Sequence, residues 1–307
     1  MDLIGKKVLI TGGAGFIGSH LVDALLENGA EVVIIDDLSA GSMGNVNKKA
    51  VFYEMNIIDD STEKIFRKEN PEIVFHLASI TDVPRSIENP LYDFSSMFGA
   101  LRVLDVCRRI AVSRFIFTSS GFVYGNTRTR PIVESEPFKP ISPYAISKNL
   151  IENYLKFYKN VYGLPYVVLR LATVYGPRQA KGAMVDYIEK LHAGSQAEFY
   201  GDGSKTRDYV YIDDVIAAIL KSLDVEKFYD EPVFNIGSGV ETSLKELYYM
   251  IAELLGRVPE PVIMPDRPGE LNGYSLDSSK AKIVLSWEPG CSLSRGLLNI
   301  MKYRRLI

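Results

Sequence analysis

A tyrosine and a lysine stand four positions apart in the segment PYAISK, residues 143–148. Residues four apart on an α-helix share a face, so the Tyr144 phenol and the Lys148 amine can reach one ligand. A free tyrosine, with a pKa of about 10, is a poor base at neutral pH, but a neighbouring ammonium group stabilises its phenolate. Taken alone, the pair is better explained as two common helix-surface residues, so a catalytic role depends on the rest of the chain.

Two serines supply a hydroxyl that could work with this pair. Ser119 and Ser120 end the stretch RFIFTSS, residues 114–120, which is typical of a buried strand. Tyr144 follows Ser120 by 24 residues, so the hydroxyl and the phenol can converge on one substrate. We predict that Tyr144 removes a proton from a substrate hydroxyl while a hydride leaves the same carbon. Ser120 or Ser119 would hydrogen-bond the developing carbonyl oxygen.

A glycine-rich turn near the N-terminus indicates where the hydride acceptor would bind. The strand-like run at residues 7–11 leads into GGAGFIG, residues 12–18, and helical spacing of apolar residues follows over residues 19–28. Residues 31–36, EVVIID, read as a second strand, which completes a βαβ unit. Glycines at such a turn let the backbone approach a pyrophosphate at the positive end of the helix.

Asp36, at the end of the second predicted strand, favours NAD over NADP. It lies 18 residues after Gly18, where a carboxylate can accept hydrogen bonds from the adenosine ribose hydroxyls. A 2′-phosphate would meet two carboxylates, Asp36 and Asp37, and no adjacent arginine. Asp37 by itself is more simply a solvated loop residue.

Strands and helices alternate through the first half of the chain. Further strands are predicted at residues 50–54, 73–78, 114–120 and 167–170, and a long helix at about 89–110. This alternation predicts an α/β fold with a doubly wound parallel (Rossmann) sheet. Ligands of such sheets collect at the carboxyl ends of the strands, where the glycine turn, Ala78 and the two serines all fall.

Asn56 and His76 each allow a structural and a functional interpretation. The Asn56 amide could reach the adenine edge, or it could form a simple Asx turn. His76 lies inside the apolar run IVFHLA, residues 73–78, so we expect a hydrogen-bonded core residue rather than a catalyst.

The overall composition argues against several classes of function. The chain has 307 residues, 47% of them hydrophobic, and a formal net charge of −3, which gives no basic field for nucleic acid or an anionic membrane. Cys107 and Cys291 lie far apart and outside any metal-ligand spacing, so we expect neither a disulfide nor a bound metal. No apolar run has the length of a signal peptide or a membrane span, and we expect a cytoplasmic protein.

The second half contains fewer predicted elements. They are helices at residues 183–193, 214–223 and 242–255, the last capped by Thr242 or Ser243, and a strand at 209–212. These elements are too few for an independent core, so we expect a smaller lobe interleaved with the sheet domain. We assign residues 1–172 to NAD binding, with the sheet completed by segments from the second half, and residues 173–307 mainly to substrate binding.

Motifs along almost the whole chain resemble those of extended short-chain dehydrogenases/reductases of the NAD-dependent epimerase/dehydratase kind, and most of all the UDP-glucose (UDP-galactose) 4-epimerases. The motifs are TGGAGFIG (11–18), DDL (36–38), HLAS (76–79), TSSGFVYG (118–125), PYAISK (143–148), RLATVYGPR (170–178), GDGSKTRDYVYIDD (201–214), NIGSG (235–239) and RPGE (267–270). Each motif alone is only suggestive, whereas together they are specific for the superfamily.

The resemblance implies a site and a reaction, in which Tyr144 and Lys148 are the catalytic pair and Ser120 is the substrate-facing hydroxyl. It implies reversible oxidation at C4 of a UDP-sugar, with NAD held throughout, and a homodimer through the helix near 89–110 and the helix that follows Tyr144. The residues implied to contact NAD are Gly12, Gly15, Phe16, Ile17, Gly18, Asp36, Asp37, Asn56, Ile57, Leu77, Ala78, Ser79, Tyr144 and Lys148. Those implied to contact the UDP-sugar are Thr81, Ser119, Ser120, Tyr144, Thr173, Arg207, Arg267 and Tyr274, with the two arginines on the diphosphate.

Two features give conflicting indications of the sugar. Tyr274 stands at the position of the family's size gate and favours glucose and galactose over N-acetyl sugars. The loop VPRS, residues 83–86, resembles epimerases that accept N-acetylated or acidic sugars. We rank the plain hexose first. The alternatives are a UDP-N-acetylhexosamine or UDP-uronate epimerase, a keto-sugar reductase and a non-catalytic NAD or UDP-sugar sensor.

Three departures from the family pattern bear on these expectations. Gly121 and Phe122 stand where the related 4,6-dehydratases have an Asp-Glu pair, which counts against elimination of water. Thr173 and Ser96 each replace a usual asparagine. Both keep a hydrogen-bonding side chain but leave the pose of the substrate open.

Overall fold

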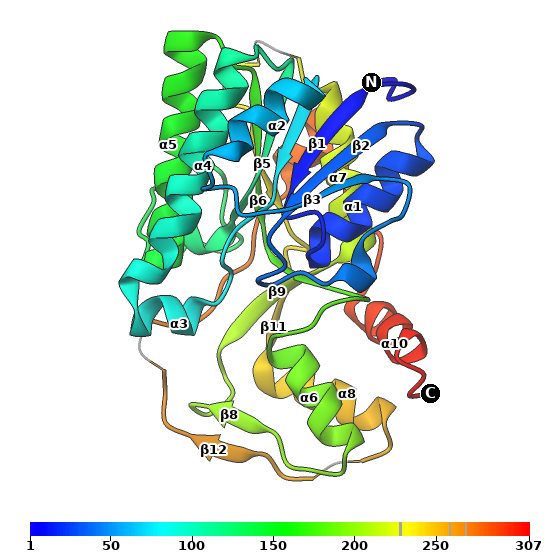
Figure 1. Ribbon diagram of the computed structural model, residues 1–307. Coiled ribbons are helices and arrows are strands. Elements are labelled where there is room, and N and C mark those ends of the chain that lie inside the picture. The colour runs from blue at the N-terminus through cyan, green and yellow to red at the C-terminus, as the bar shows by residue number, and fades with distance from the viewer. Residues whose placement is uncertain (227–228, 258, 268) are drawn as a thin grey trace.

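Seven parallel strands form the central sheet, and they come from both halves of the chain (Figure 1). In the computed structural model, which describes residues 1–226, 229–257, 259–267 and 269–307, the strand order is β10-β6-β5-β4-β1-β2-β3. The strands are β1 (Lys7–Thr11), β2 (Glu31–Asp36), β3 (Val51–Glu54), β4 (Ile73–His76), β5 (Arg114–Ser120), β6 (Tyr166–Leu171) and β10 (Val233–Ile236). The predicted doubly wound parallel sheet is confirmed.

Helices cover both faces of this sheet, because alternate residues of each strand point to opposite sides. In β1, Val8 and Ile10 join one apolar core and Leu9 joins the other. The first core is covered by α1 (Phe16–Glu27) and α7 (Ile212–Lys221), and the second by α2 (Ser61–Glu69), α4 (Phe94–Arg109) and α5 (Pro143–Tyr162). Among the helices of the described residues, none is long and apolar enough to cross a lipid bilayer.

Several element boundaries differ from the predicted ones. Helix α1 begins three residues earlier than expected, because Gly15 takes the N-cap position directly after the glycine turn. The helix predicted at 89–110 divides into the 3-10 helix η2 (Pro90–Asp93) and α4. Two short helices, α2 and α3 (Val83–Glu88), were not predicted, and β4 ends at His76 rather than Ala78.

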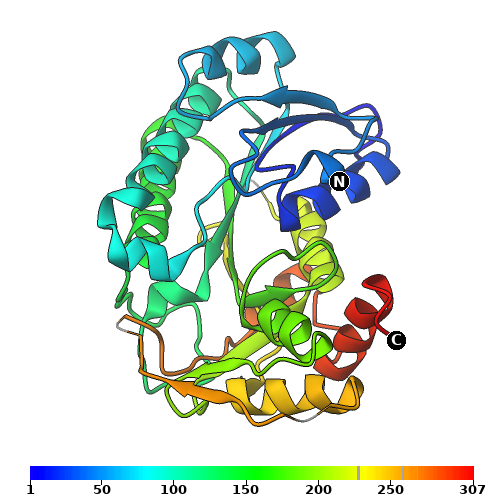
Figure 2. The same ribbon diagram turned by 60° about the horizontal axis from the view of Figure 1, so that its bottom comes forward.

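The chain leaves the sheet after β6 and forms a smaller lobe below it in Figure 1. The lobe holds a three-stranded sheet, β11-β9-β7, and a two-stranded sheet, β12-β8. Helix α6 packs against α8, as Figure 2 shows from the side of the lobe, and Ser243 forms a capping box with Glu246. The remaining bounds are β7 (Thr173–Tyr175), α6 (Ala183–His192), β8 (Glu198–Tyr200), β9 (Thr206–Tyr211), β11 (Glu241–Ser243), α8 (Leu244–Leu254), β12 (Val262–Met264), α9 (Ser279–Leu285) and α10 (Leu293–Tyr303).

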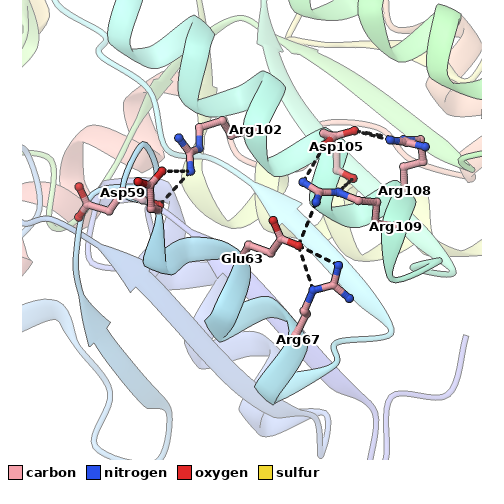
Figure 3. Close-up of polar contacts among 8 residues, drawn as sticks. Asp59, Glu63, Arg67, Arg102, Asp105, Arg108 and Arg109 are labelled. Atoms are coloured by element: carbon pink, nitrogen blue, oxygen red, sulfur yellow. Dashed lines mark hydrogen bonds and ion pairs between the residues drawn. The ribbon is translucent and has the colours of Figure 1, made fainter.

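A cluster of ion pairs joins α2 to α4 at the surface (Figure 3). The Glu63 carboxylate accepts hydrogen bonds from Arg67, one turn further along α2, and from Arg109 of α4. Arg108 and Arg109 both pair with Asp105. Exposed pairs contribute little stability individually. The two helices are therefore held together mainly by the apolar core beneath the cluster, which includes Phe66 of α2.

Candidate active site

The glycine turn between β1 and α1 packs tightly against the end of β4. Gly12 has a φ of +77°, and a Cβ there would lie 2.7 Å from the Ala78 backbone nitrogen. A Cβ on Gly18 would collide with the Gly12 carbonyl oxygen. Gly15 caps α1 without a side-chain hydrogen bond, so the first N–H groups of the helix stay available to a ligand. The turn therefore fits a dinucleotide pyrophosphate, as the sequence predicted.

Asp36 ends β2 beside this turn. Its carboxylate is buried and accepts hydrogen bonds from the backbone N–H groups of Ala14 (2.9 Å) and Leu38 (2.8 Å). Burial raises the pKa of Asp36, and these two donors oppose the rise. Each carboxylate oxygen keeps an acceptor position for a ribose hydroxyl. The site thus fits NAD and opposes a 2′-phosphate.

In the segment after β3, the polar side chain of Asn56 forms hydrogen bonds with other groups of the protein. Asn56 Oδ1 accepts from the Ile58 N–H (3.1 Å), which is an Asx turn, and Asn56 Nδ2 donates to Asp37 (2.7 Å). Asp37 is exposed, as a solvated loop carboxylate would be. Ile57 is a core residue next to Gly99 of α4. Contacts of Asp37, Asn56 and Ile57 with NAD stay a prediction.

Tyr144 and Lys148 lie on the buried side of α5, near its N-terminus. Ser142 caps this helix and Pro143 takes its first position. Lys148 Nζ lies 5.8 Å from the centre of the Tyr144 ring and donates to the Thr118 carbonyl oxygen of β5 (2.9 Å). The two side chains are 9% and 4% exposed, so both are largely removed from water. The predicted shared face, at the carboxyl end of β5, is confirmed.

The protein by itself does not make the Tyr144 phenol acidic. Burial raises the pKa of Tyr144 to about 12; hydrogen bonding to Ser120 opposes this rise and the Asp93 carboxylate adds to it. Burial lowers the pKa of Lys148 to about 8, against Asp93 and Glu152. Activation of Tyr144 by Lys148 together with the positive nicotinamide ring of bound NAD stays a prediction. A second positive charge beside the phenol is needed.

The two serines at the end of β5 have different partners. Ser120 is the one that interacts with Tyr144 and lowers its pKa, and the Ser120 Oγ accepts from the Phe122 N–H (3.2 Å). Ser119 donates to Glu152 of α5 at 2.5 Å, and Glu152 pairs with Arg170 of β6 at 2.7 Å in the buried interior. Ser119 is thus engaged in the core. A contact of Ser119 with the substrate stays a prediction, and Ser120 is the more available hydroxyl of the two.

His76 is a hydrogen-bonded core residue, as expected. Its ring is fully buried, and Nδ1 shares a 2.7 Å hydrogen bond with Thr11 Oγ1 of β1. Burial lowers the pKa of His76 to about 3, so the imidazole is neutral at physiological pH.

An aromatic wall, formed by Tyr144, Phe122 and Tyr274, lies beside the proton-transfer group. The Phe122 ring meets Tyr144 edge-on at 6.2 Å and Tyr274 at 5.6 Å. The Tyr274 hydroxyl shares a 3.0 Å hydrogen bond with Thr173 Oγ1 of β7. The structure therefore brings the predicted Thr173 and Tyr274 together. Sequence analysis missed Phe122 as a site residue, although its place two residues after Ser120 was a usable signal.

Arg207 adjoins the aromatic wall. Its Nη1 donates to the Leu271 carbonyl oxygen (3.0 Å), and its guanidinium carbon lies 5.9 Å from the centre of the Phe122 ring. Of the five N–H donors of this guanidinium, those on Nη2 and Nε stay free of these contacts. Arg207 can therefore hold an anionic group next to the wall.

Arg267 lies in the same loop as Leu271, the residue that Arg207 contacts, and precedes it in the sequence. Its guanidinium carbon stacks 3.2 Å from the centre of the Tyr200 ring. The Arg267 Nη1 atom lies 3.8 Å from the Glu270 Oε1 atom. The structure does not bring Arg267 into contact with the aromatic wall. Pro268 of the RPGE motif lies outside the described residues.

The remaining predicted residues surround the ends of β1 and β4. The Ala78 N–H donates to Thr11 Oγ1 (3.3 Å), and Ser96 accepts from the Ile80 N–H (2.9 Å), so Ser96 has a structural partner. Thr81 is exposed in the loop before α3. The others, Phe16, Ile17, Leu77 and Ser79, are partly buried near the glycine turn.

The glycine turn, Asp36, Ser120 and the Tyr144 helix meet along one edge of the parallel sheet. This edge places a dinucleotide next to a phenol and a hydroxyl that can exchange a proton with a substrate. That arrangement defines the short-chain dehydrogenase/reductase class of Rossmann-fold enzymes. Residues 8–237 match the model of the NAD dependent epimerase/dehydratase family. The chain belongs to this family, and its cofactor is NAD.

Relatives of known name are similar to the chain over nearly its whole length. The UDP-glucose 4-epimerase of Mycolicibacterium smegmatis is 38% identical over 310 residues, which cover 97% of this chain and 98% of the relative. The crystal structure of the Thermotoga maritima UDP-glucose 4-epimerase with UDP-glucose has a TM-score of 0.94 at 43% identity, covering 97% and 98% of the two chains. The Bacillus cereus UDP-glucuronic acid 4-epimerase with UDP-glucuronic acid and NAD has a TM-score of 0.91 at 31% identity, covering 98% and 100%.

Proposed function

We propose that the protein is a UDP-hexose 4-epimerase, which interconverts UDP-glucose and UDP-galactose through a transient 4-keto sugar. The observation that carries this proposal is the group at the end of β5, where the buried Tyr144 phenol lies beside the Lys148 ammonium and the Ser120 hydroxyl acts on its pKa. Such a group exchanges a proton with a sugar hydroxyl. The full-length similarity to 4-epimerases of UDP-sugars supports the same reaction.

In the proposed reaction, Tyr144 takes the proton of the sugar 4-hydroxyl and later returns it. NAD, when bound, supplies a hydride acceptor that also gives the hydride back. Ser120 hydrogen-bonds the C4 oxygen as it gains carbonyl character. Lys148 would hold the nicotinamide ribose and adds positive charge near the phenol. Because the keto sugar turns over before reduction, C4 is inverted without net oxidation.

We assign the two ends of the site to different parts of the chain. The glycine turn and Asp36, within residues 1–172, would hold the pyrophosphate and adenosine ribose of NAD. Residues 173–307 would mainly hold the nucleotide sugar, with Arg207 and Arg267 on its diphosphate. Arg207 is the better placed of the two, because it adjoins the aromatic wall.

The choice of sugar rests on Tyr274. A buried phenol tied to Thr173 narrows the space beside the wall, which favours a hydroxyl over an N-acetyl group on the sugar. A UDP-uronate is the second candidate, because the Bacillus cereus relative carries UDP-glucuronic acid and covers almost the whole chain.

A substrate screen tests the proposal. The purified protein, with its NAD content measured, is incubated separately with UDP-glucose, UDP-galactose, UDP-N-acetylglucosamine and UDP-glucuronate without added reductant. Chromatography should show the same glucose–galactose mixture from either hexose and slower conversion of the other two. Stoichiometric consumption of added NADH would indicate a reductase instead, and an unchanged set of sugars would overturn the proposal.

Tyr144→Phe tests the role of the phenol. The variant should lose about 10²- to 10⁴-fold in turnover, because it cannot transfer the proton. It should keep NAD, since the phenol oxygen is not part of the glycine turn. Tyr154→Phe, on the exposed side of the same helix, is the matched control and should stay active. A parallel fall of NAD content and activity would show that the role assignment is wrong.

We also propose that two copies of the chain associate through α4 and α5. These helices pack on each other and lie at one side of the molecule in Figure 1. Their outer surface carries apolar side chains that are more than a third exposed: Phe94, Phe98, Ile146, Tyr154, Phe157, Val161 and Tyr162. An apolar surface spread over two adjacent helices is typical of a self-association site.

A further inference from the structure

Asp93 is a buried carboxylate without a hydrogen-bond partner. It ends η2, immediately before α4, and is 3% exposed. Within the described residues neither of its carboxylate oxygens is hydrogen-bonded, and it does not cap α4 with its side chain. A carboxylate removed from water is costly unless an opposite charge compensates it. The position of Asp93 therefore calls for a nearby cation.

Lys148 is a buried cation without a carboxylate partner among the described residues. It is 4% exposed, and its hydrogen bond goes to the neutral Thr118 carbonyl. In the described part of the chain, no carboxylate lies within ion-pair distance of Lys148 Nζ. Glu152, one helical turn further along α5, is instead bound by Arg170 and Ser119. Because η2 packs against α5, Asp93 and Lys148 belong to the same interior region.

We propose that Asp93 is a positioning residue for the epimerisation, in which its carboxylate is the counter-charge of the Lys148 ammonium and sets the protonation of the Tyr144–Lys148 pair. This inference rests on the proposed function for its catalytic consequence. The electrostatic coupling between Asp93 and Lys148 is inferred only from their two buried charges, which lack ion-pair partners within the described residues, and does not depend on the proposed function. Nothing in the sequence motifs singled out Asp93.

The electrostatics of the region agree with this role. The Lys148 charge lowers the pKa of Asp93 against the larger effect of burial, which raises it to about 6. In return, Asp93 raises the pKa of Lys148 and that of Tyr144. Asp93 is thus ionised above about pH 6, where it interacts with both members of the pair.

The other titratable groups around the pair do not replace Asp93. On β4, His76 has a pKa of about 3 and is uncharged at neutral pH. Burial raises the pKa of Tyr274, next to Tyr144, so this phenol is also uncharged. Glu152 on α5 is paired with Arg170 of β6. Of these groups, Asp93 is the one whose charge changes between pH 5 and 7.

Asp93→Asn tests the proposal through the pH dependence of turnover. Removing the anion lowers the pKa of both Tyr144 and Lys148, so the part of the pH profile of kcat above about pH 6 should move to lower pH by about 1 unit. Below about pH 6 the wild-type Asp93 is protonated, and the two profiles should converge. Asp60→Asn, an exposed carboxylate paired with Arg102, is the control and should not shift the profile. A profile that stays in place, with only lower thermal stability, would overturn the proposal.

A second measurement is independent of the sugar substrate. Ultraviolet titration of the NAD-loaded protein, with the Tyr144→Phe variant subtracted, reports the ionisation of Tyr144 alone. Asp93→Asn should lower this pKa by about 1 unit, whatever reaction the enzyme catalyses. An unchanged Tyr144 titration would refute the coupling even if epimerase activity were confirmed.

If Asp93→Asn does not fold, the reciprocal coupling can be measured with Asp93 intact. NMR of protein labelled with ¹³C-aspartate would follow the Asp93 carboxyl in the wild type and in Lys148→Met. The pKa of Asp93 should rise in Lys148→Met, because the ammonium that lowers it is absent. Equal pKa values in the two proteins would overturn the proposal.

Discussion

At the scale of single residues, Phe122 connects the proton-transfer group to the residue proposed to select the sugar. It touches both Tyr144 and Tyr274, and its own ring is partly exposed. Tyr274 is fixed by Thr173, whereas Phe122 has no polar atom with which a neighbour could fix it. Its size is therefore the simplest property of the wall to change without breaking a hydrogen bond.

Phe122→Ala should widen the aromatic wall beside Tyr274, the residue proposed to select the sugar. We expect the ratio of kcat/KM for UDP-N-acetylglucosamine to that for UDP-glucose to rise by about 10-fold, because a larger substituent then fits. Competition between the two sugars, followed by chromatography, measures this ratio directly. Phe98→Ala on the outer surface of α4 serves as the control. A ratio that does not change would remove Phe122 from the sugar site.

Sequence reasoning found the residues whose role follows from their place on a strand or a helix. The glycine turn, Asp36, and the Tyr144–Lys148 face were all predicted from spacing. The raised pKa of Tyr144 could not be predicted, because it comes mainly from burial by residues distant in sequence. The same holds for Ser119, whose partner Glu152 is 33 residues away.

At the scale of elements, the buried pair of Glu152 and Arg170 ties α5 to β6. Both side chains are 6% exposed, and Ser119 of β5 joins them by a further hydrogen bond. Arg170 also donates to Tyr124 (2.6 Å). The network therefore fixes α5, the helix that carries Tyr144, relative to strands β5 and β6.

Glu152→Gln should be strongly destabilising. It leaves the buried Arg170 without its counter-charge, and breaking a buried pair on one side costs about 3–5 kcal/mol of unfolding free energy. Urea unfolding measures this change, with Asp105→Asn in the exposed α2–α4 cluster as the control (Figure 3). A loss below about 1 kcal/mol would place Glu152 in the range of surface pairs and contradict the expectation.

Long, periodic elements were predicted well, and short ones were not. β1, β2 and β5 have the predicted bounds, because each is a continuous apolar run. Helix α2 was missed because its sequence, STEKIFRKE, is mostly polar, and only Thr62 and Phe66 are buried. The three-residue strands β7, β8, β11 and β12 are too short to show a period, and their partners are fixed by tertiary contacts.

At the scale of the whole molecule, the exposed apolar surface of α4 and α5 predicts association in solution. If the proposed dimer forms, Phe157→Glu should convert it to a monomer, because the substitution places a charge on that apolar surface. Sedimentation velocity at several concentrations distinguishes the two states. Ile263→Glu, at an exposed apolar position in the smaller lobe, should leave the dimer intact. A monomeric wild type, or a variant that stays dimeric, would contradict the proposed interface.

Strand β10 connects the smaller lobe to the central sheet, where it pairs with β6. The chain departs from the sheet after β6, builds β7, α6, β8 and β9, and comes back through α7 to the neighbouring strand β10. It then enters the lobe a second time and adds β11, α8 and β12. Each small sheet of the lobe therefore joins a strand from before β10 to one from after it, β9 to β11 and β8 to β12, so the lobe forms only when both segments are present. Conversely, a fragment ending at residue 172 would expose the hydrogen-bonding edge of β6. Such an open edge is prone to aggregate, and recombination between relatives should therefore exchange β10 together with the lobe segments on both sides of it.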